Sequence, residues 1–448
     1  MSINQQYSYI SLLLIHVGIG VVVFLFPFVS KIYSLSLFFY GIYYLIKTHN
    51  QNNEALVLSA YVIGVEVLFR MTDGMFFNEY AKYSIMIFLF IGMIYTGFSK
   101  NAYLYWFFLI LLVPGIILST LTLSFEANIR KAIAFNISGP VCLGLASIYC
   151  YRRNVSFDRL KQVLAAFCFP LVAILVYLYL YTPSVKDVVT DTQSNFETSG
   201  GFGPNQMATV LGLGIFLFFT QMLLFSPTKK LQLINGILVL FFAFRGLVTF
   251  SRGGVFAGIF MIILLLVVVY FESGMKGRTK ITLIILFSTL AALAVWTYSS
   301  LQTGGLIDKR YANEDALGRK KVSRLTGREA LIESEFQMFL DHPFLGVGVG
   351  KNKELREELT GIESASHNEL TRMLAEHGSL GLLGLLILLI TPLVLYFGHR
   401  HNIFALPFLV FWLLTINHAA MRIAAPAFIY ALSLLKVYHI EKTVVHRE

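Results

Sequence analysis

Charged residues are scarce in this chain. Only 13% of its 448 residues are Asp, Glu, Lys or Arg, whereas soluble domains carry roughly 25%. Hydrophobic residues make up 56% of the sequence, and the mean hydropathy is +0.70. So little charge cannot cover the surface of a soluble protein of this length. The composition therefore excludes an ordinary soluble enzyme and predicts an integral membrane protein.

Cysteine and metal-binding motifs are also nearly missing. The three cysteines, Cys142, Cys150 and Cys168, fall inside apolar segments at spacings that match no zinc or redox pattern. Buried thiols in such places act as packing residues. HExxH, GxSxG and DxD motifs are missing, and the glycine run 346–350 with Lys351 is no P-loop because neither Ser nor Thr follows the lysine.

The net charge of +10 raises the question of a nucleic-acid partner. Most of the basic residues, however, stand in short loops between apolar segments, where they act as orientation signals. The remainder lie in one long polar segment, where they would face an anionic ligand. We therefore predict no nucleic-acid partner.

Apolar runs recur along almost the whole chain and are long enough to cross about 30 Å of hydrocarbon. They lie near residues 10–29, 31–47, 55–70, 83–98, 103–123, 135–150, 164–182, 205–225, 231–250, 254–271, 280–300, 379–397, 403–420 and 422–438. Several of these runs are short, so we expect twelve to fourteen helices. Helices are required because the runs lack the alternation of barrel strands, and lipid leaves no other way to satisfy the backbone. The predicted fold is an all-α, polytopic transmembrane helix bundle with a large, partly helical external loop.

The basic loops set the orientation. They fall on one side of the membrane, so the positive-inside rule places both termini in the cytoplasm. We predict three parts: transmembrane helices 1–11 in residues 1–300, a large external loop carrying catalytic elements in 301–378, and the last helices with a short cytoplasmic tail in 379–448. The loops at 183–204 and around 251–254 would also lie outside.

The long loop contains predicted helices of its own. Thr326-Gly-Arg-Glu329 is a capping box that opens a helix with an apolar face, and His342-Pro343 ends that helix. The apolar face would consist of Ile332, Phe336, Phe339 and Leu340. A glycine-rich turn at 346–350 and a charged helix at 353–359 follow. Ser366-His-Asn-Glu369 is a second capping box, and Gly378 ends its helix.

Arg252, in Ser251-Arg-Gly-Gly254, is the first candidate site residue. Arg245 lies seven residues earlier, so on a helix both guanidinium groups share one face. An arginine in an apolar segment costs at least ~2.5–3.5 kcal/mol at mid-bilayer. Two on one face favour a cationic wall for a phosphate group. The alternative is snorkelling with an ion pair, for example to Glu66.

Arg328 is the best candidate in the basic run 309–328. The capping box places it in the first turn of a helix, where backbone N–H groups also favour an anion. The usual meaning of such a run is a solvated face, and that interpretation applies here as well. Lys309 and Arg310 open the run.

His367 is the candidate proton acceptor. At the start of a helix its ring would stay neutral and could act as a general base for a sugar hydroxyl. A histidine in this position is more often a simple polar cap residue. Glu376 could reach the same cleft or only cap the helix end. Asn205, in Phe202-Gly-Pro-Asn205, forms a turn before the next helix or lines a substrate mouth.

Taken together, these pieces resemble the O-antigen ligase and O-antigen polymerase superfamily of bacterial envelopes. The resemblance is carried, in order, by Gly-Pro-Asn205, Ser-Arg252-Gly-Gly, Gly-Arg328, His342-Pro-Phe-Leu-Gly-Val-Gly348, Ser-His367-Asn368-Glu and Ala-Glu376-His-Gly378. It covers roughly residues 200–385 by motif. The first 200 residues match only in hydropathy.

The resemblance implies glycosyl transfer at the outer face of the bacterial cytoplasmic membrane, without nucleotide, metal or other cofactor. The donor would be an undecaprenyl-pyrophosphate-linked glycan, and the acceptor a lipid A core sugar, another glycan or a protein hydroxyl. Arg252 and Arg328 would hold the pyrophosphate, and His367 would deprotonate the acceptor. We add Asn205, Arg245, Asn368 and Glu376 as candidate substrate-binding residues, the role of Arg245 being inferred from spacing alone.

Two alternatives to a ligase remain open. A repeat-unit polymerase of the same superfamily carries the same motifs. A lipid or polysaccharide transporter would need ionisable groups at mid-membrane and preferably an inverted repeat. Only Glu66 and Arg245 are candidates for such groups, and no repeat is evident.

Overall fold

The structure is a computed structural model that describes residues 3–124, 128–321, 329–361, 364, 366–398, 402–418 and 421–439. Within these residues it is an all-α bundle, as the sequence predicts. The helices are α1 (Ile3–Leu25), α2 (Val29–Thr48), α3 (Glu54–Met71), α4 (Tyr80–Thr96), α5 (Tyr103–Thr122), α6 (Ile129–Cys150), α7 (Phe157–Tyr181), α8 (Pro204–Thr220), α9 (Lys229–Val248), α10 (Arg252–Glu272), α11 (Met275–Gln302), α12 (Leu306–Tyr311), α13 (Glu329–Asp341), α14 (Lys351–Thr360), α15 (Glu369–Gly398), α16 (Ala405–Ile416) and α17 (Ala425–Leu432).

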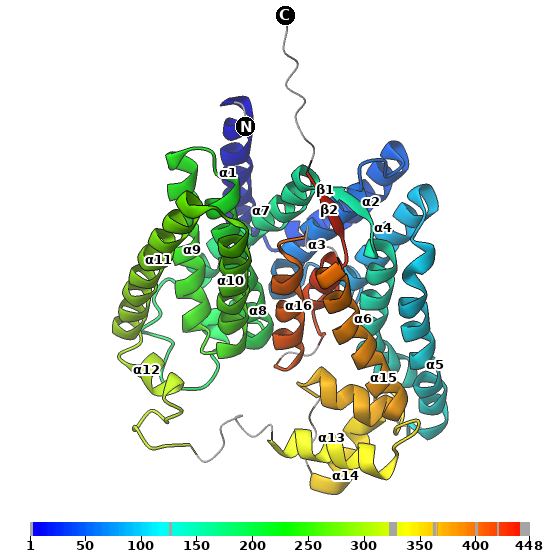
Figure 1. Ribbon diagram of the computed structural model, residues 1–448. Helices are drawn as coiled ribbons and strands as arrows, with labels where there is room; N and C mark the ends of the chain where they lie inside the picture. The colour runs from blue at the N-terminus through cyan, green and yellow to red at the C-terminus, as the bar shows by residue number, and fades with distance from the viewer. Residues whose placement is uncertain are drawn as a thin grey trace, which may run out of the picture.

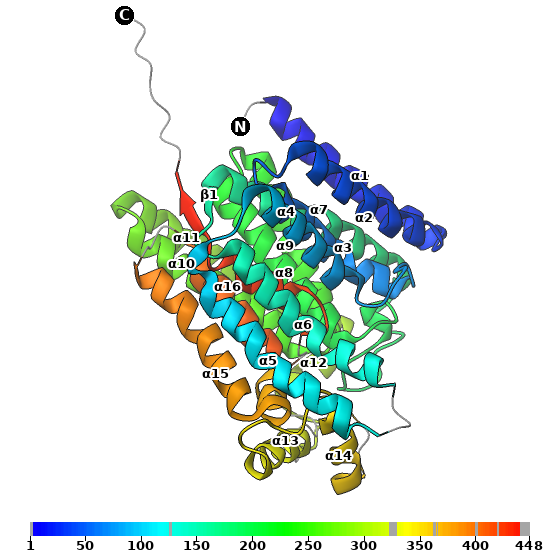
Figure 2. The ribbon, with the colours of Figure 1, turned by 90° about the vertical axis from the view of Figure 1, so that its right-hand side faces the viewer.

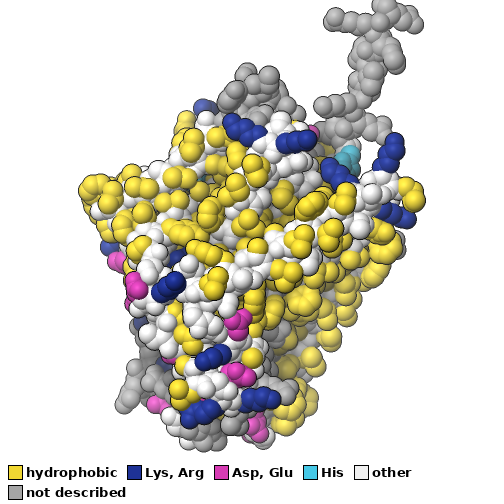
Figure 3. All heavy atoms as spheres, turned by 90° about the vertical axis from the view of Figure 1, so that its left-hand side faces the viewer, with side chains coloured by type: hydrophobic (Ala, Val, Ile, Leu, Met, Phe, Trp, Pro, Cys, Tyr) yellow, Lys and Arg dark blue, Asp and Glu magenta, His cyan; other side chains and the backbone are white. Residues whose placement is uncertain are grey.

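Ten of the described helical stretches are long and apolar enough to cross a membrane. They include α1, α2 and α5–α11 as well as α15, while α4 and α16 are shorter apolar helices. This indicates a multi-pass membrane protein. Long α11 buries only Ile281 and Ser299 against the rest of the bundle, as a lipid-facing helix does. Figure 3 shows hydrophobic side chains spread over this flank, with charged side chains toward its ends.

The prediction of a final membrane segment at 422–438 is wrong. The helix there, α17, has eight residues and would rise only about 12 Å. The chain then forms strand β2 (Lys436–Tyr438), which pairs in parallel with β1 (Asn154–Ser156). All eight residues of α17 are buried in the bundle. The segment is apolar because protein surrounds it, and hydropathy does not distinguish protein from lipid surroundings.

Helices α8 and α10 approach closely because glycines lie where they cross. A Cβ atom on Gly212 would lie 1.9 Å from the Gly254 carbonyl oxygen, and one on Gly258 would lie 2.3 Å from the Gly212 oxygen. Small residues permit such backbone approach between membrane helices. The crossing brings the first turns of α8 and α10 together at one end of the bundle.

Helices α12–α14 lie at the end of the bundle opposite to the β1–β2 pair (Figure 1). The turned view shows α13 and α14 beyond the ends of α5 and α15 (Figure 2). The glycine-rich turn joins this layer to the bundle, because the Val347 amide donates to the Ala375 carbonyl at 2.9 Å and the Val349 amide to that of Gly115 at 3.2 Å. Gly346 adopts a φ of 70°, which favours glycine.

Helix α15 is broken at Gly378, where φ is 60° and ψ is −138°. The sequence places the end of the polar helix at this residue, and the backbone confirms the break. The apolar face predicted for α13 is wrong, because Phe336 and Leu340 are about half exposed. The buried face contains Leu331, Glu335 and Met338 instead. Apolar periodicity did not identify this face because the face includes Glu335, which is buried in an ion pair with Arg356.

Candidate active site

A cavity of about 300 Å³ lies where the end of the bundle meets α13. Six separate parts of the chain line it: the starts of α8 and α10, the end of α12, one face of α13, the turn before α15 and the turn after α16. The lining residues are Asn205, Ser251, Arg252, Gly253, Phe256, Arg310, Leu331, Ile332, Glu335, Ser366, His367, Asn368, Asn417 and His418. Arg252, His367, Asn205 and Asn368, all singled out by the sequence, share this cavity.

Arg252 is the first residue of α10, and its neighbours explain the Ser-Arg-Gly-Gly sequence. The Ser251 hydroxyl donates to Asn205 Oδ1 at 2.8 Å, which joins the starts of α8 and α10. A Cβ atom on Gly253 would lie 2.6 Å from the ring of His418, and one on Gly254 would lie 2.1 Å from the Ala208 backbone. Any larger residue after Arg252 would push the helix away from α8 and from His418.

Arg310 is a cavity residue that the sequence did not single out from its basic run. Its side chain is only 7% exposed, and Nε donates to the Phe250 carbonyl at 2.9 Å. Arg252 Nη1 in turn donates to the Arg310 carbonyl at 3.4 Å. Burial raises the pKa of neighbouring Tyr311 to about 12, although the charges of Arg252 and Arg310 oppose that rise. Two arginine side chains therefore stand together at this wall.

The turn that carries His367 differs in detail from the predicted capping box. The N-cap of α15 is Asn368, whose Oδ1 accepts from the Leu370 amide at 2.9 Å. Ser366 Oγ accepts from the Asn368 amide at 3.2 Å. Glu369 does not reach back to the serine, because its carboxylate binds Arg372 within the same helix. His367 thus precedes the helix, half-buried at the cavity wall, and is not in its first turn.

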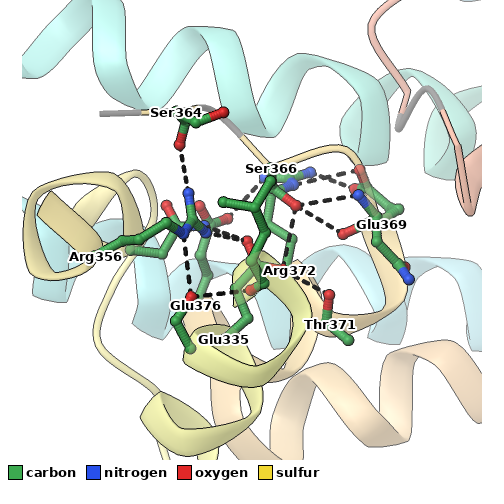
Figure 4. Close-up of polar contacts among 12 residues, drawn as sticks. Glu335, Arg356, Ser364, Ser366, Glu369, Thr371, Arg372 and Glu376 are labelled. Carbon is green, nitrogen blue, oxygen red and sulfur yellow. Dashed lines mark hydrogen bonds and ion pairs between the residues drawn. The ribbon is translucent and has the colours of Figure 1, made fainter. Parts of the chain in front are cut away.

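Glu335 anchors this turn from α13. Its carboxylate is 1% exposed and accepts from Ser366 Oγ at 3.2 Å, Thr371 Oγ1 at 2.5 Å and Arg356 Nη2 at 2.5 Å. Burial raises the pKa of Glu335, while the hydrogen bond from Thr371 and the charge of Arg356 act against that rise. Figure 4 shows these groups converging from α13, α14 and α15. The turn before α15 is therefore held by its neighbours on both sides.

Glu376 belongs to the support of the cavity and does not line it. Its carboxylate accepts from Arg372 Nη1 at 2.7 Å and from the Gly350 amide at 2.8 Å. The turn before α15 has a further contact, because Arg422 Nη2 donates to the Ser366 carbonyl at 2.8 Å. Glu376 was expected to bind substrate, but here it fixes the glycine-rich turn to α15.

Arg245 also lies away from the cavity lining. Helix α9 ends at Val248 and α10 starts at Arg252, so the two arginines do not share the face of one helix. The buried Arg245 guanidinium donates to the carbonyls of Thr182 at 3.3 Å and Thr198 at 2.9 Å. Within the part of the chain that the structure describes, Arg245 does not pair with Glu66 either, because that carboxylate binds Arg70 at 2.9 Å and the Ala424 amide at 2.9 Å. Arg245 fastens the loop that follows α7.

Arg328 and the Thr326 capping box lie outside the described residues. Residues that sequence reasoning missed are His418, Asn417, Glu335 and Arg310. Nothing local marks His418, which follows an apolar helix as a lone histidine. Glu335 was hidden because it occupies a helix position expected to face solvent. Among the described residues, no group of three or more His, Cys, Asp or Glu side chains could hold a metal ion.

The cavity combines cationic and proton-accepting groups. Arg252 and Arg310 supply positive charge, and the carboxylate of Glu335, which also lines the cavity, is paired with Arg356. Arginine binds phosphate oxygens with two N–H groups at once. His367 lines the same cavity from another segment, the turn before α15. The arrangement can hold an anion and accept a proton beside it.

Comparison with known families bears on the same region. Residues 237–386, about a third of the chain, match the family described as O-antigen ligase. The match supports the resemblance to the O-antigen ligase-like superfamily and includes both Arg252 and His367. Asn205 and His418, which complete the cavity, lie outside it. No curated protein matches the chain.

Proposed function

We propose, on the premise that residues 237–386 are those of an O-antigen ligase-like protein, that the chain transfers a glycan from undecaprenyl-pyrophosphate to an acceptor hydroxyl. The observation that carries the proposal is one cavity lined by Arg252, Arg310 and His367. A pyrophosphate leaving group needs positive charge, and an acceptor hydroxyl needs a base. Both kinds of group line the same cavity.

In the proposed reaction the acceptor oxygen attacks the anomeric carbon of the donor glycan, and its proton passes to His367. The bond from that carbon to the pyrophosphate oxygen breaks, and undecaprenyl pyrophosphate leaves with the bonding electrons. Arg252 and Arg310 stabilise the negative charge that develops on the leaving oxygen. Arg328 would add to this charge stabilisation. Because the leaving group is good, positioning and charge stabilisation carry most of the rate enhancement.

The position of the cavity supports a reaction at the outer face of the membrane. Residues of α12 and α13 line the cavity, and Figure 1 shows these helices at the end of the bundle opposite to the β1–β2 pair. The basic loops 152–161, 229–230 and 276–280 lie on the side expected to be cytoplasmic. The neighbouring Leu331, Ile332 and Phe256 offer apolar contacts beside the polar wall. A polyprenyl carrier needs both kinds of surface.

The decisive experiment gives the purified protein, in lipid nanodiscs, a labelled undecaprenyl-pyrophosphate glycan with and without acceptors. We expect label to move to a lipid A core or a protein acceptor. Longer lipid-linked chains would identify a polymerase of the same superfamily. Transport of the carrier without transfer would contradict the proposal.

A matched pair of histidine variants tests the base. His367→Ala should lower the transfer rate by about 10²–10⁴-fold, the range that general bases contribute. His342→Ala is the control, because His342 is exposed in the same layer and does not line the cavity. A folded His367→Ala protein with the rate of the control would overturn the assignment of the base.

A further inference from the structure

The exposed side of α13 and the turn after it carry large apolar side chains. Phe336 and Leu340 lie four residues apart, one above the other on the helix, and each is about half exposed. In the turn that follows, Phe344 is 78% exposed and Leu345 about half exposed. We call these four residues the apolar line. So many large apolar groups exposed within residues 336–345 mark an interaction surface.

A polar line runs beside the apolar one. Glu333, Gln337 and Asp341 are exposed at intervals of four residues, and Gln337 Nε2 donates to Asp341 Oδ1 at 3.0 Å. The opposite face of α13 is covered by protein, because Met338 lies in a buried cluster with Val347. A helix with an apolar and a polar line side by side on its exposed half is typical of helices that lie in a membrane interface.

Contacts with α5 indicate the depth of this region. The Val349 amide donates to the Gly115 carbonyl at 3.2 Å, well before the end of α5. Helix α5 continues through residues 116–122, which rise about 10 Å further. Ile117 and Leu121 are exposed along this length, and α5 is apolar enough to span a membrane. The glycine-rich turn therefore lies beside the last two turns of a helix whose exposed side chains suit lipid.

Contacts with α15 connect the apolar line to a second membrane helix. The Ser379 amide donates to the Pro343 carbonyl at 2.7 Å, and the Ser379 hydroxyl donates to that of Phe344 at 3.2 Å. After Ser379 the helix is apolar, with Leu382 and Leu386 exposed as on a lipid-facing helix. The apolar line thus continues the lipid-facing surface of α15, which favours lipid as its partner.

We propose that α13 lies in the membrane interface at the cavity end of the bundle. The apolar line enters the acyl chains of the leaflet on that side, and the polar line faces the head groups and water. The inference concerns how the chain meets the bilayer, and it holds whether or not the cavity transfers a glycan.

The same helix forms part of the cavity. Ile332, four residues before Phe336 on the same side of the helix, lines the cavity. Glu335, on the buried face, accepts from the Ser366 hydroxyl in the turn of His367. An apolar surface therefore runs from the leaflet to the cavity, and the helix that holds the His367 turn rests on the bilayer.

The experiment compares two spin-labelled variants in phospholipid nanodiscs, with the three buried native cysteines replaced by alanine. Leu340→Cys places the label on the apolar line, and Gln337→Cys places it on the polar line of the same helix. Power saturation measures access to oxygen, which concentrates in hydrocarbon, and to a water-soluble nickel chelate. We expect the label at Leu340 to favour oxygen and the label at Gln337 to favour nickel.

Charge substitutions test the same surface without a label. Leu340→Glu should lower the midpoint of thermal unfolding in nanodiscs, because a charge in hydrocarbon is costly. Gln337→Glu is the matched control and should melt like wild type. Leu340→Gln, which loses the apolar packing but adds no charge, should fall between the control and Leu340→Glu. Equal melting of Leu340→Glu and Leu340→Gln would contradict contact with acyl chains.

The outcomes separate this inference from the proposed function, because neither measurement needs a substrate. A label at Leu340 that favours nickel would show the apolar line in water and overturn the inference. An immobilised label shielded from both reagents would show that a second copy or another protein covers the line, which also overturns it. The expected oxygen contrast without any glycan transfer would support the inference and count against the transferase alone.

Discussion

Arginine is used in two different ways on the two sides of the cavity. On the α13–α15 side, buried arginines bind carboxylates: Arg356 binds Glu335, and Arg372 binds both Glu369 and Glu376. On the α8–α12 side, Arg252 and Arg310 donate to backbone carbonyls. A carbonyl fixes a guanidinium without neutralising it. The first side is thus a scaffold of buried ion pairs, whereas the arginines of the second side line the cavity.

The difference matters because substitution of the two kinds of arginine should have different effects. Removing one member of a buried ion pair leaves an uncompensated charge in the interior and costs stability. Removing an arginine that faces a cavity leaves the fold intact and costs affinity for an anion. The following predictions use this contrast, beginning with the largest effect.

Arg356→Met should destabilise the protein by about 3–5 kcal/mol, because it leaves the buried Glu335 carboxylate without its partner. The double variant Glu335→Gln with Arg356→Met removes both charges and should recover a large part of this loss. Thermal unfolding in nanodiscs measures both effects. A double variant as unstable as the sum of the singles would contradict the ion pair.

Arg252→Ala should lower kcat/KM by about 10²–10³-fold, the range found when one charge-stabilising donor is removed. Its midpoint of thermal unfolding should stay close to that of wild type, since its described hydrogen bond is a long one to the Arg310 carbonyl. Arg252→Lys keeps the charge but not the paired N–H groups, so its kcat/KM should fall between those of wild type and Arg252→Ala. A melting point lowered as in Arg356→Met would remove the contrast between the two sides.

Ser366→Ala should slow transfer about tenfold, because it removes the hydroxyl that joins the His367 turn to Glu335 and to the Asn368 amide. A hydrogen bond to a charged group is worth about 1.5–3 kcal/mol. Ser364→Ala is the matched control, since that residue contacts Arg356 through its backbone carbonyl. Equal rates for the two variants would show that the turn is held by its backbone alone.

Asn205→Ala should have the smallest effect, a loss of activity of a few-fold. It removes the acceptor for the Ser251 hydroxyl, and a neutral hydrogen bond contributes about 0.5–1.5 kcal/mol. The start of α10 should become less well placed without unfolding. A loss as large as that of Arg252→Ala would instead mean that Asn205 contacts the substrate directly.

Local signals were enough for the membrane helices and for the polar layer. Apolar runs marked the spans because hydrocarbon accepts little else, and the break at Gly378 followed from glycine in a position that needs positive φ. The prediction of a membrane segment at 422–438 was wrong for the same reason, because burial in protein and burial in lipid give the same hydropathy. The prediction of the apolar face of α13 was wrong because a buried carboxylate, that of Glu335, was not expected on the buried face of this helix.

The sequence by itself determined the class of the protein, the helix-rich loop and the candidates Arg252 and His367, because these depend on composition and on motifs within short stretches. Only the tertiary structure decided which candidates meet. It placed Arg245 and Glu376 in the support of the fold, and it brought His418 and Arg310 to the cavity. The reason is physical: whether a charged side chain binds a carbonyl, a carboxylate or a ligand depends on partners that lie tens or hundreds of residues away in the chain.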